Sequence, residues 1–151
     1  MTMQIVRAGI VGGVVGAVVL QLFLVGAAVL TTGAPPLAIV VSLWQFAAEE
    51  AIGNVALTSS SYAWIGGAVY FIVSIVWAVA FAYVAHRRAQ VVQQPIVSGI
   101  VYGVIVWIGT QLVLVATGLF KPPAPNVAET ELIAYCVFFG LPLAYTVRRF
   151  V

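Results

Sequence analysis

The chain has 151 residues, of which 64% are hydrophobic and only 7% are charged, and its net charge is +2. A soluble domain carries about 25% charged residues, so this composition excludes an ordinary soluble enzyme or binding domain. The small net charge and the lack of a basic cluster argue against nucleic acid as a partner. We therefore expect one all-α integral membrane domain, residues 1–151, whose first partner is the lipid bilayer.

Four windows reach the roughly 20 apolar residues that cross a bilayer, and together they leave no room for a soluble catalytic domain. They lie near residues 5–31, 62–85, 95–119 and 132–147. The apolar run in the first window, residues 8–30, exceeds the 7–15 residues of a signal peptide. We expect a retained helix there, and cleavage near the small residues at Gly33 and Ala34 is the alternative.

The segment between the first two windows predicts a helix over about residues 36–52. Pro36 stands at its start and Gly53 follows its end, which is typical helix punctuation. Ser42, Gln45 and Glu49 form a polar stripe on an otherwise apolar helix. Because the segment is short and ends in acids, we expect it to be interfacial on the outer side or re-entrant.

The charged residues separate into two groups when the chain is threaded through four spans. Most basic residues fall on one side, namely Arg7, His86, Arg87, Arg88, Arg148 and Arg149. Lys121 and all four acids, Glu49, Glu50, Glu129 and Glu131, fall on the other. Because Lys and Arg mark the cytoplasmic face, we expect a multi-pass protein with both termini in the cytoplasm.

The first and third spans resemble each other at an offset of 90 residues. Residues 9–25 and 99–115 share nine identities in 17 positions, including two glycines four apart and the glutamines Gln21 and Gln111. This pattern predicts a parallel duplicated helix pair with a pseudo-twofold axis along the membrane normal, in which Tyr70 and Tyr135 reach a similar depth. Convergent apolar composition is the alternative.

The candidate binding residues are polar but uncharged. They are Gln21, Gln111, Tyr70 and Tyr135, with Ser74 and Thr110 nearby. Polar side chains in hydrocarbon need partners, so one interpretation is an interhelical hydrogen-bond clamp. The other is a pocket for a small molecule, a quinone or a lipid headgroup that opens to the outer leaflet. No ionisable group lies deep within a predicted span, which disfavours ion-coupled carriers.

Other reactive side chains offer weaker signals. The four glutamates could meet on the outer face and bind a divalent cation, or they could be hydrated loop ends. His86 belongs to a basic anchor, and Cys136 is a single packing residue that cannot form an intramolecular disulfide. No nucleophile–base pair, phosphate loop or zinc spacing appears, so we expect no catalytic residue, no metal site and no cofactor.

Three stretches in spans two to four carry a family resemblance. They are "SIVWA" with a following "AHRR", "PIVSGIVYGVIVW", and "FFGLPLAYTVRR". The chain thereby resembles an uncharacterised family of small bacterial inner-membrane proteins with four transmembrane helices, of the YagU type. The resemblance implies a bacterial inner membrane and no particular activity. Histidine often stands in that pattern where this chain has Tyr70 and Tyr135, which argues against a family metal or haem site here.

Two functions remain after these exclusions. We expect a non-enzymatic accessory or scaffold subunit that works with other membrane subunits or by self-association. The rival is a transport or binding protein for a small molecule, quinone or lipid at the glutamine–tyrosine layer. A membrane enzyme is disfavoured because no acid–base pair reaches the predicted membrane interior.

Overall fold

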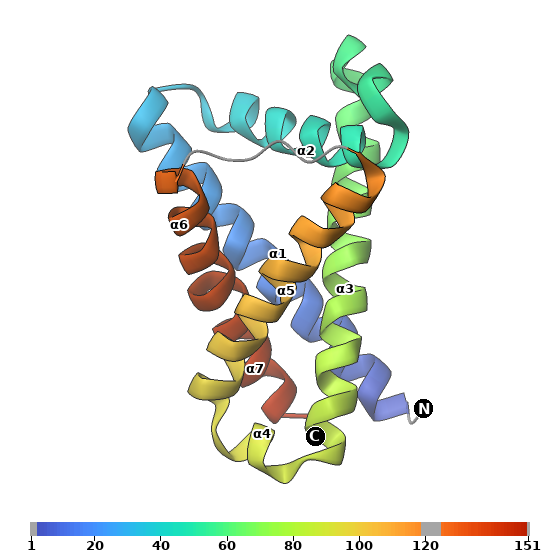
Figure 1. The fold of residues 1–151 in the computed structure, drawn as a ribbon, viewed down its shortest axis with the longest axis vertical. Helices are drawn as coiled ribbons and strands as arrows, with labels where there is room; N and C mark the ends of the chain where they lie inside the picture. Colours follow the sequence, from blue (N-terminus) through green and yellow to red (C-terminus); the bar gives the residue numbers. More distant parts are fainter. Residues whose placement is uncertain (1–2, 119–124, 151) are drawn as a thin grey trace.

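The computed structural model describes residues 3–118 and 125–150, and every regular element in these ranges is a helix (Figure 1). Four stretches are long and apolar enough to cross a membrane, at Met3–Thr32, Ser60–Arg87, Pro95–Ala116 and Val127–Arg148. Each overlaps a predicted span. The expected all-α membrane architecture with four spans is therefore confirmed.

The elements follow one another with short connections. In chain order they are α1 (Met3–Thr32), α2 (Pro36–Ile52), η1 (Gly53–Thr58), η2 (Ser60–Tyr62), α3 (Ala63–Arg87), α4 (Ala89–Gln93), α5 (Pro95–Thr117), α6 (Pro125–Ile133), η3 (Ala134–Gly140) and α7 (Leu141–Arg148). Pro36 and Pro95 begin α2 and α5, where the missing proline N–H costs no helical hydrogen bond. Gly118 ends α5 with a φ of 73°, a left-handed conformation that favours glycine.

The fourth span differs most from its prediction. It begins at Pro125 rather than near residue 132, so Glu129 and Glu131 belong to the helix instead of preceding it. Its middle, η3, is a π-helix that leads directly into Pro142. Proline has no N–H to donate and its ring clashes with the carbonyl four residues earlier. The wider turn of a π-helix accommodates this clash and changes which side chains face the bundle.

Glycines set the closest helix crossings within each half of the chain. A methyl group added at Gly13 would lie 2.7 Å from the Cα of Ile75, so α1 and α3 touch backbone to backbone. The matching glycine of α5, Gly103, meets Cys136 of the fourth span, where a methyl group would lie 2.5 Å from the Cα. The two sequence-related glycines therefore serve the same purpose in the two halves. The twofold rotation between the halves stays a prediction.

The same contacts define which residues of the second and fourth spans correspond. A methyl group on Gly13 would lie 3.0 Å from the Ser74 carbonyl oxygen, and one on Gly103 would lie 2.6 Å from that of Tyr135. By these contacts Tyr135 corresponds to Ser74, one helical turn from Tyr70. Tyr70 and Tyr135 line the same cavity, and their similar depth stays a prediction. Gly13 and Gly103 set the point at which the two helices of each pair cross. The alignment of the second span with the fourth therefore follows these glycines and not the tyrosines.

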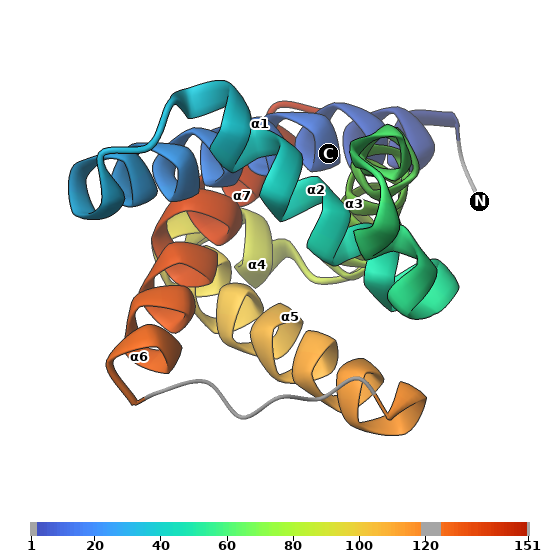
Figure 2. The ribbon, with the colours of Figure 1, turned by 90° about the horizontal axis from the view of Figure 1, so that it is seen from above.

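Helix α2 covers one end of the bundle. It matches the predicted helix at residues 36–52 and lies across the ends of the spans, from α1 to α3 (Figures 1 and 2). A methyl group at Gly66 would lie only 1.6 Å from the Trp44 carbonyl oxygen, and Gly67 contacts the Trp44 ring. Only glycine permits this approach, so the Gly66–Gly67 pair holds α2 against α3.

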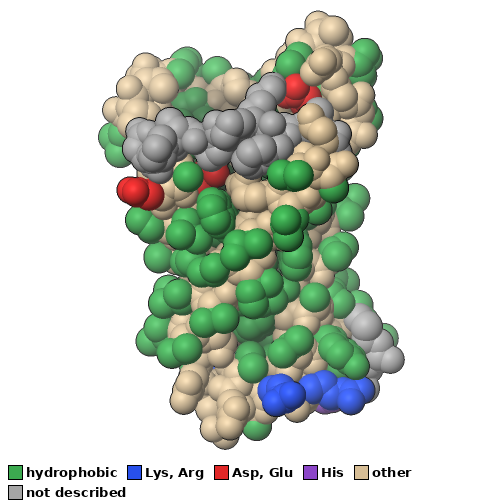
Figure 3. Space-filling model, in the orientation of Figure 1, with side chains coloured by type: hydrophobic (Ala, Val, Ile, Leu, Met, Phe, Trp, Pro, Cys, Tyr) green, Lys and Arg blue, Asp and Glu red, His purple; other side chains and the backbone are tan. Residues whose placement is uncertain are grey.

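Charges separate along the long axis of the molecule (Figure 3). The blue arginines gather at the end opposite α2, where Arg7 lies 5.6 Å from the ring centre of Phe150 and Arg87 lies 5.2 Å from that of Tyr83. The red carboxylates lie at the α2 end. This is the separation that the sequence predicts for the described residues, whereas Lys121 lies outside them.

Candidate functional site

A cavity of about 260 Å³ lies under α2, at the carboxylate end of the bundle. All four spans and α2 contribute to its wall. The lining includes every candidate residue from the sequence: Gln21, Gln111, Tyr70, Tyr135, Ser74 and Thr110. The structure thus brings the six residues together around one space, and their role in binding a ligand stays a prediction.

Apolar side chains close the cavity toward the arginine end. Leu20, Val106 and Phe139 line it and are no more than 2% exposed. Each lies within about one helical turn of a polar lining residue, on the arginine side of it. The cavity therefore has an apolar base with polar side chains above it, and Leu43, Phe46 and Ala47 of α2 add apolar surface at the other end. A mostly apolar wall with a few polar groups suits an amphipathic ligand.

The two tyrosines are held by neighbouring polar groups. The Tyr70 hydroxyl donates a hydrogen bond of 2.9 Å to the Ala17 carbonyl and thereby links α3 to α1. The Tyr135 hydroxyl lies beside the Thr110 hydroxyl, which itself donates to the Val106 carbonyl at 2.9 Å. The Tyr70 ring is thus fixed in the wall by a hydrogen bond within the chain.

Gln21 does not form the predicted clamp. Its Nε2 is buried and has no hydrogen-bond partner among the described residues, so no bond to Gln111 or to a tyrosine satisfies it. The hydrogen bond that links α3 to α1 here comes from the Tyr70 hydroxyl, which donates to the backbone carbonyl of Ala17. An unsatisfied buried polar group costs about 1–3 kcal/mol, which makes Gln21 a place where a ligand or water acceptor is favoured.

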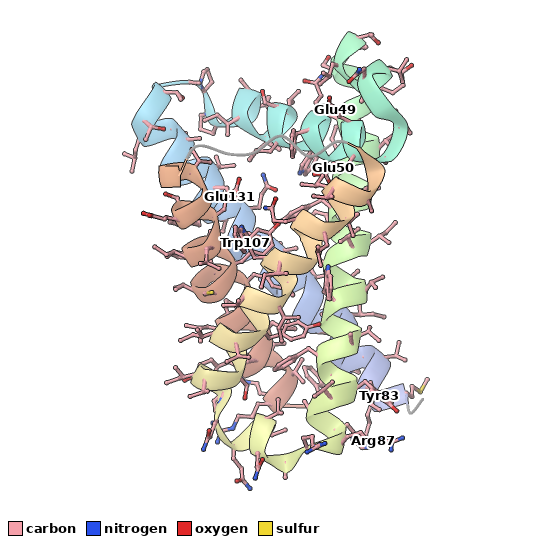
Figure 4. The ribbon with its side chains drawn as sticks, in the orientation of Figure 1. Glu49, Glu50, Tyr83, Arg87, Trp107 and Glu131 are labelled. Atoms are coloured by element: carbon pink, nitrogen blue, oxygen red, sulfur yellow. The ribbon has the colours of Figure 1, made fainter. Side chains whose placement is uncertain are left out.

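Two indole nitrogens repeat this pattern. Trp44 lines the cavity from α2, and its buried Nε1 also has no partner within the described chain. Trp107 Nε1 is likewise buried and forms no hydrogen bond at standard geometry, although the Glu131 side chain is its neighbour (Figure 4). The site therefore holds more donors than the described side chains satisfy.

Two carboxylates line the cavity, although neither was among the candidate binding residues. Glu50 reaches it from α2 and Glu131 from α6 (Figure 4). The interpretation as hydrated loop ends does not fit Glu50 and Glu131, which line the cavity, or Glu49, which is 5% exposed. Glu129 is exposed as expected, but it lies in α6 and not in a loop. Burial raises the pKa of Glu50, and repulsion by Glu49 raises it further.

The four glutamates do not gather around one point. No group of three or more His, Cys, Asp or Glu side chains in the described ranges could hold a metal ion. Glu50 and Glu131 face the cavity, whereas Glu129 is exposed. The described residues therefore give no support to the divalent-cation alternative.

The sequence matches a family of unknown function, DUF6789, over residues 3–151. The chain belongs to the DUF6789 family. No curated protein and no solved structure matches it. Membership agrees with an integral membrane protein of unknown activity, and the resemblance to the YagU type stays a prediction.

Spacing could have revealed the carboxylates of this DUF6789 chain. Glu131 precedes Tyr135 by four residues, which places both on one face of a helix once the helix is known to begin before them. Glu50 follows Leu43 by seven residues, so these two share the inner face of α2. The predicted polar stripe misled here, because the Ser42 hydroxyl bonds to the Ala38 carbonyl of its own helix.

Proposed function

We propose that this protein binds an amphipathic small molecule in the cavity under α2. The observation that carries the proposal is the Gln21 amide: its buried Nε2 has no partner among the described residues, and Gln21 lines the cavity together with Gln111 and two tyrosines. Natural proteins satisfy nearly all buried polar groups, so an acceptor is expected at this position. The apolar base of the cavity would take the remainder of the molecule.

The accessory or scaffold role that the sequence favours stays a prediction. Association with another subunit would need free small-residue faces, where helices approach closely. Two glycines of α1 already serve contacts within the chain: Gly12 meets Leu143, and Gly16 meets Phe139. The binding role draws more support, because the cavity and its partnerless donors have no equivalent explanation in packing alone.

The position of Glu131 bears on the expectation that the protein is not an enzyme. The expectation of no activity depended on the absence of an acid–base pair from the predicted membrane interior, whereas Glu131 belongs to the fourth span and lines the cavity with Glu50. A carboxylate pair alone specifies no reaction. We therefore keep the proposal to binding, with transport across the membrane as its extension.

We further propose that the cavity lies at the outer leaflet of a bacterial inner membrane and that both termini are cytoplasmic. The arginine end supports this orientation because Lys and Arg favour the cytoplasmic side. In a Cys136→Ser background, a cysteine at Ser59 should react with an impermeant thiol reagent in intact cells, and one at Gln90 should not. Labelling at Gln90 and not at Ser59 would reverse the orientation.

The binding function is tested by measuring the amphiphile that stays bound to the protein during purification. Wild-type protein purified in a mild nonionic detergent should carry a bound amphiphile that solvent extraction and mass spectrometry detect. Gln21→Leu should lose at least about nine-tenths of it, since one tenfold loss of affinity corresponds to a single good hydrogen bond. Gln4→Leu is the matched control on the exposed, arginine-side end of α1 and should retain it. Equal retention in all three proteins would refute the proposal.

A further inference from the structure

We propose that the molecule bound in this cavity is an amphiphile whose polar end carries an ammonium group beside an oxygen acceptor, with Glu50 and Glu131 receiving the ammonium. This rests on the proposed binding function and names the chemical class of its ligand.

The charges around the cavity have one sign. Glu50 from α2 and Glu131 from α6 both line the cavity, so the two carboxylates share one space. No described Lys or Arg lines this cavity, and the described arginines lie at the opposite end of the molecule. Two like charges in a partly apolar space are unfavourable unless one carboxyl is protonated or a cation lies between them, and a ligand ammonium supplies such a cation.

The donors that lack partners define the second part of the ligand. Gln21 Nε2 and Trp44 Nε1 are buried at the same cavity and neither can bond to an ammonium, since all three groups are donors. An oxygen acceptor close to the ammonium would satisfy them. Trp44, Tyr70 and Tyr135 also line the cavity, and an aromatic ring attracts a cation that lies over its face.

The size of the cavity limits how much of the ligand it encloses. Its volume of about 260 Å³ is below the roughly 300–1,000 Å³ of pockets that surround a whole drug-sized molecule. Leu20, Val106 and Phe139 form an apolar base under the polar rim. The cavity therefore suits a polar end and the first part of an alkyl chain, and the rest of the chain would lie in lipid.

Two sources share this chemistry: the headgroup of an aminophospholipid, and a free lipophilic amine such as an alkylamine with a neighbouring hydroxyl or carbonyl. Both present an ammonium within a few bonds of an oxygen acceptor and continue into an apolar chain. The experiment separates them by competition.

The test measures binding of decylamine and of decanol to the full-length protein in nonionic detergent at about neutral pH, by tryptophan fluorescence. Decylamine should bind at least tenfold more tightly than decanol. Glu50→Gln and Glu131→Gln should each weaken decylamine at least tenfold and leave decanol within twofold. Glu129→Gln is the matched control, because Glu129 is exposed on the same helix as Glu131, and it should leave both affinities unchanged.

Competition then identifies the source. If phosphatidylethanolamine in mixed micelles displaces decylamine and phosphatidylglycerol does not, the aminolipid is the ligand; if neither displaces it, a free amine is. Both results support the ammonium site. Equal binding of decylamine and decanol, unaffected by either glutamate variant, would overturn the ammonium site and leave the binding function intact. Absence of binding by both probes would overturn the binding function as well.

Discussion

Replacing Gln21 by Leu should stabilise the ligand-free protein. The Gln21 Nε2 is buried without a partner among the described residues, so the folded state bears the cost of dehydrating a donor and gains no hydrogen bond in return. That cost is about 1–3 kcal/mol for a buried polar group. Leu has a similar size and suits a wall that already contains Leu20 and Leu24. Since only the nitrogen of the amide is known to be unsatisfied, we expect a gain of about 1–2 kcal/mol.

The assay is reversible unfolding in mixed micelles of protein from which bound lipid has been removed. Gln4→Leu, at an exposed site on the same helix, should change the free energy of unfolding by less than about 0.5 kcal/mol. Gln21→Leu and Gln111→Leu should be additive within about 0.5 kcal/mol, because no clamp joins them through Nε2. A loss of about 1 kcal/mol or more on Gln21→Leu, partly recovered in the double variant, would show that a clamp exists and refute this reasoning.

Three further substitutions test the packing and the charges. Tyr70→Phe removes the hydrogen bond to α1 and should cost about 0.6 kcal/mol of unfolding free energy, the average for such bonds in membranes, whereas the exposed Tyr83→Phe should cost nothing measurable. Gly66→Ala should separate α2 from α3 and lower both thermal stability and retained ligand, whereas Gly26→Ala, which has no atom within 4 Å of the added methyl, should lower neither. Glu50 has a raised pKa in the folded state, so its contribution to stability is full below the unfolded pKa and is lost as the pH rises through the folded pKa. Unfolding midpoints measured from about pH 4 to about pH 8 should therefore decline less in Glu50→Gln than in wild-type protein, and parallel profiles would contradict the assignment.

The sequence predicted the elements well because hydropathy and proline positions are local signals. Long apolar windows were sufficient to predict the four spans, and the prolines before α2 and Gly53 after it were sufficient to predict that helix. The gathering of Gln21 and Gln111 followed from their matched places in two related spans. These features do not depend on how the helices are rotated about their axes.

The rotation and register of the helices could not be predicted in the same way. Two features decide where Glu131 and Tyr135 lie: the π-helix before Pro142 and the early start of the fourth span. The pattern of apolar residues predicts neither feature. The Gly66 contact with Trp44 decides which face of α2 looks inward. Glu50 was therefore assigned to solvent, because in sequence it looks like any acid at the end of an interfacial helix.

Filling the cavity from α2 is the most direct test that it binds a ligand. Ala47 lines the cavity, whereas Ala38 is exposed on the same helix. Ala47→Trp should weaken decylamine binding at least tenfold and remove the retained amphiphile, and Ala38→Trp should do neither. If Ala47→Trp binds decylamine and retains the amphiphile as well as wild-type protein does, the ligand lies elsewhere and the cavity under α2 is not the binding site.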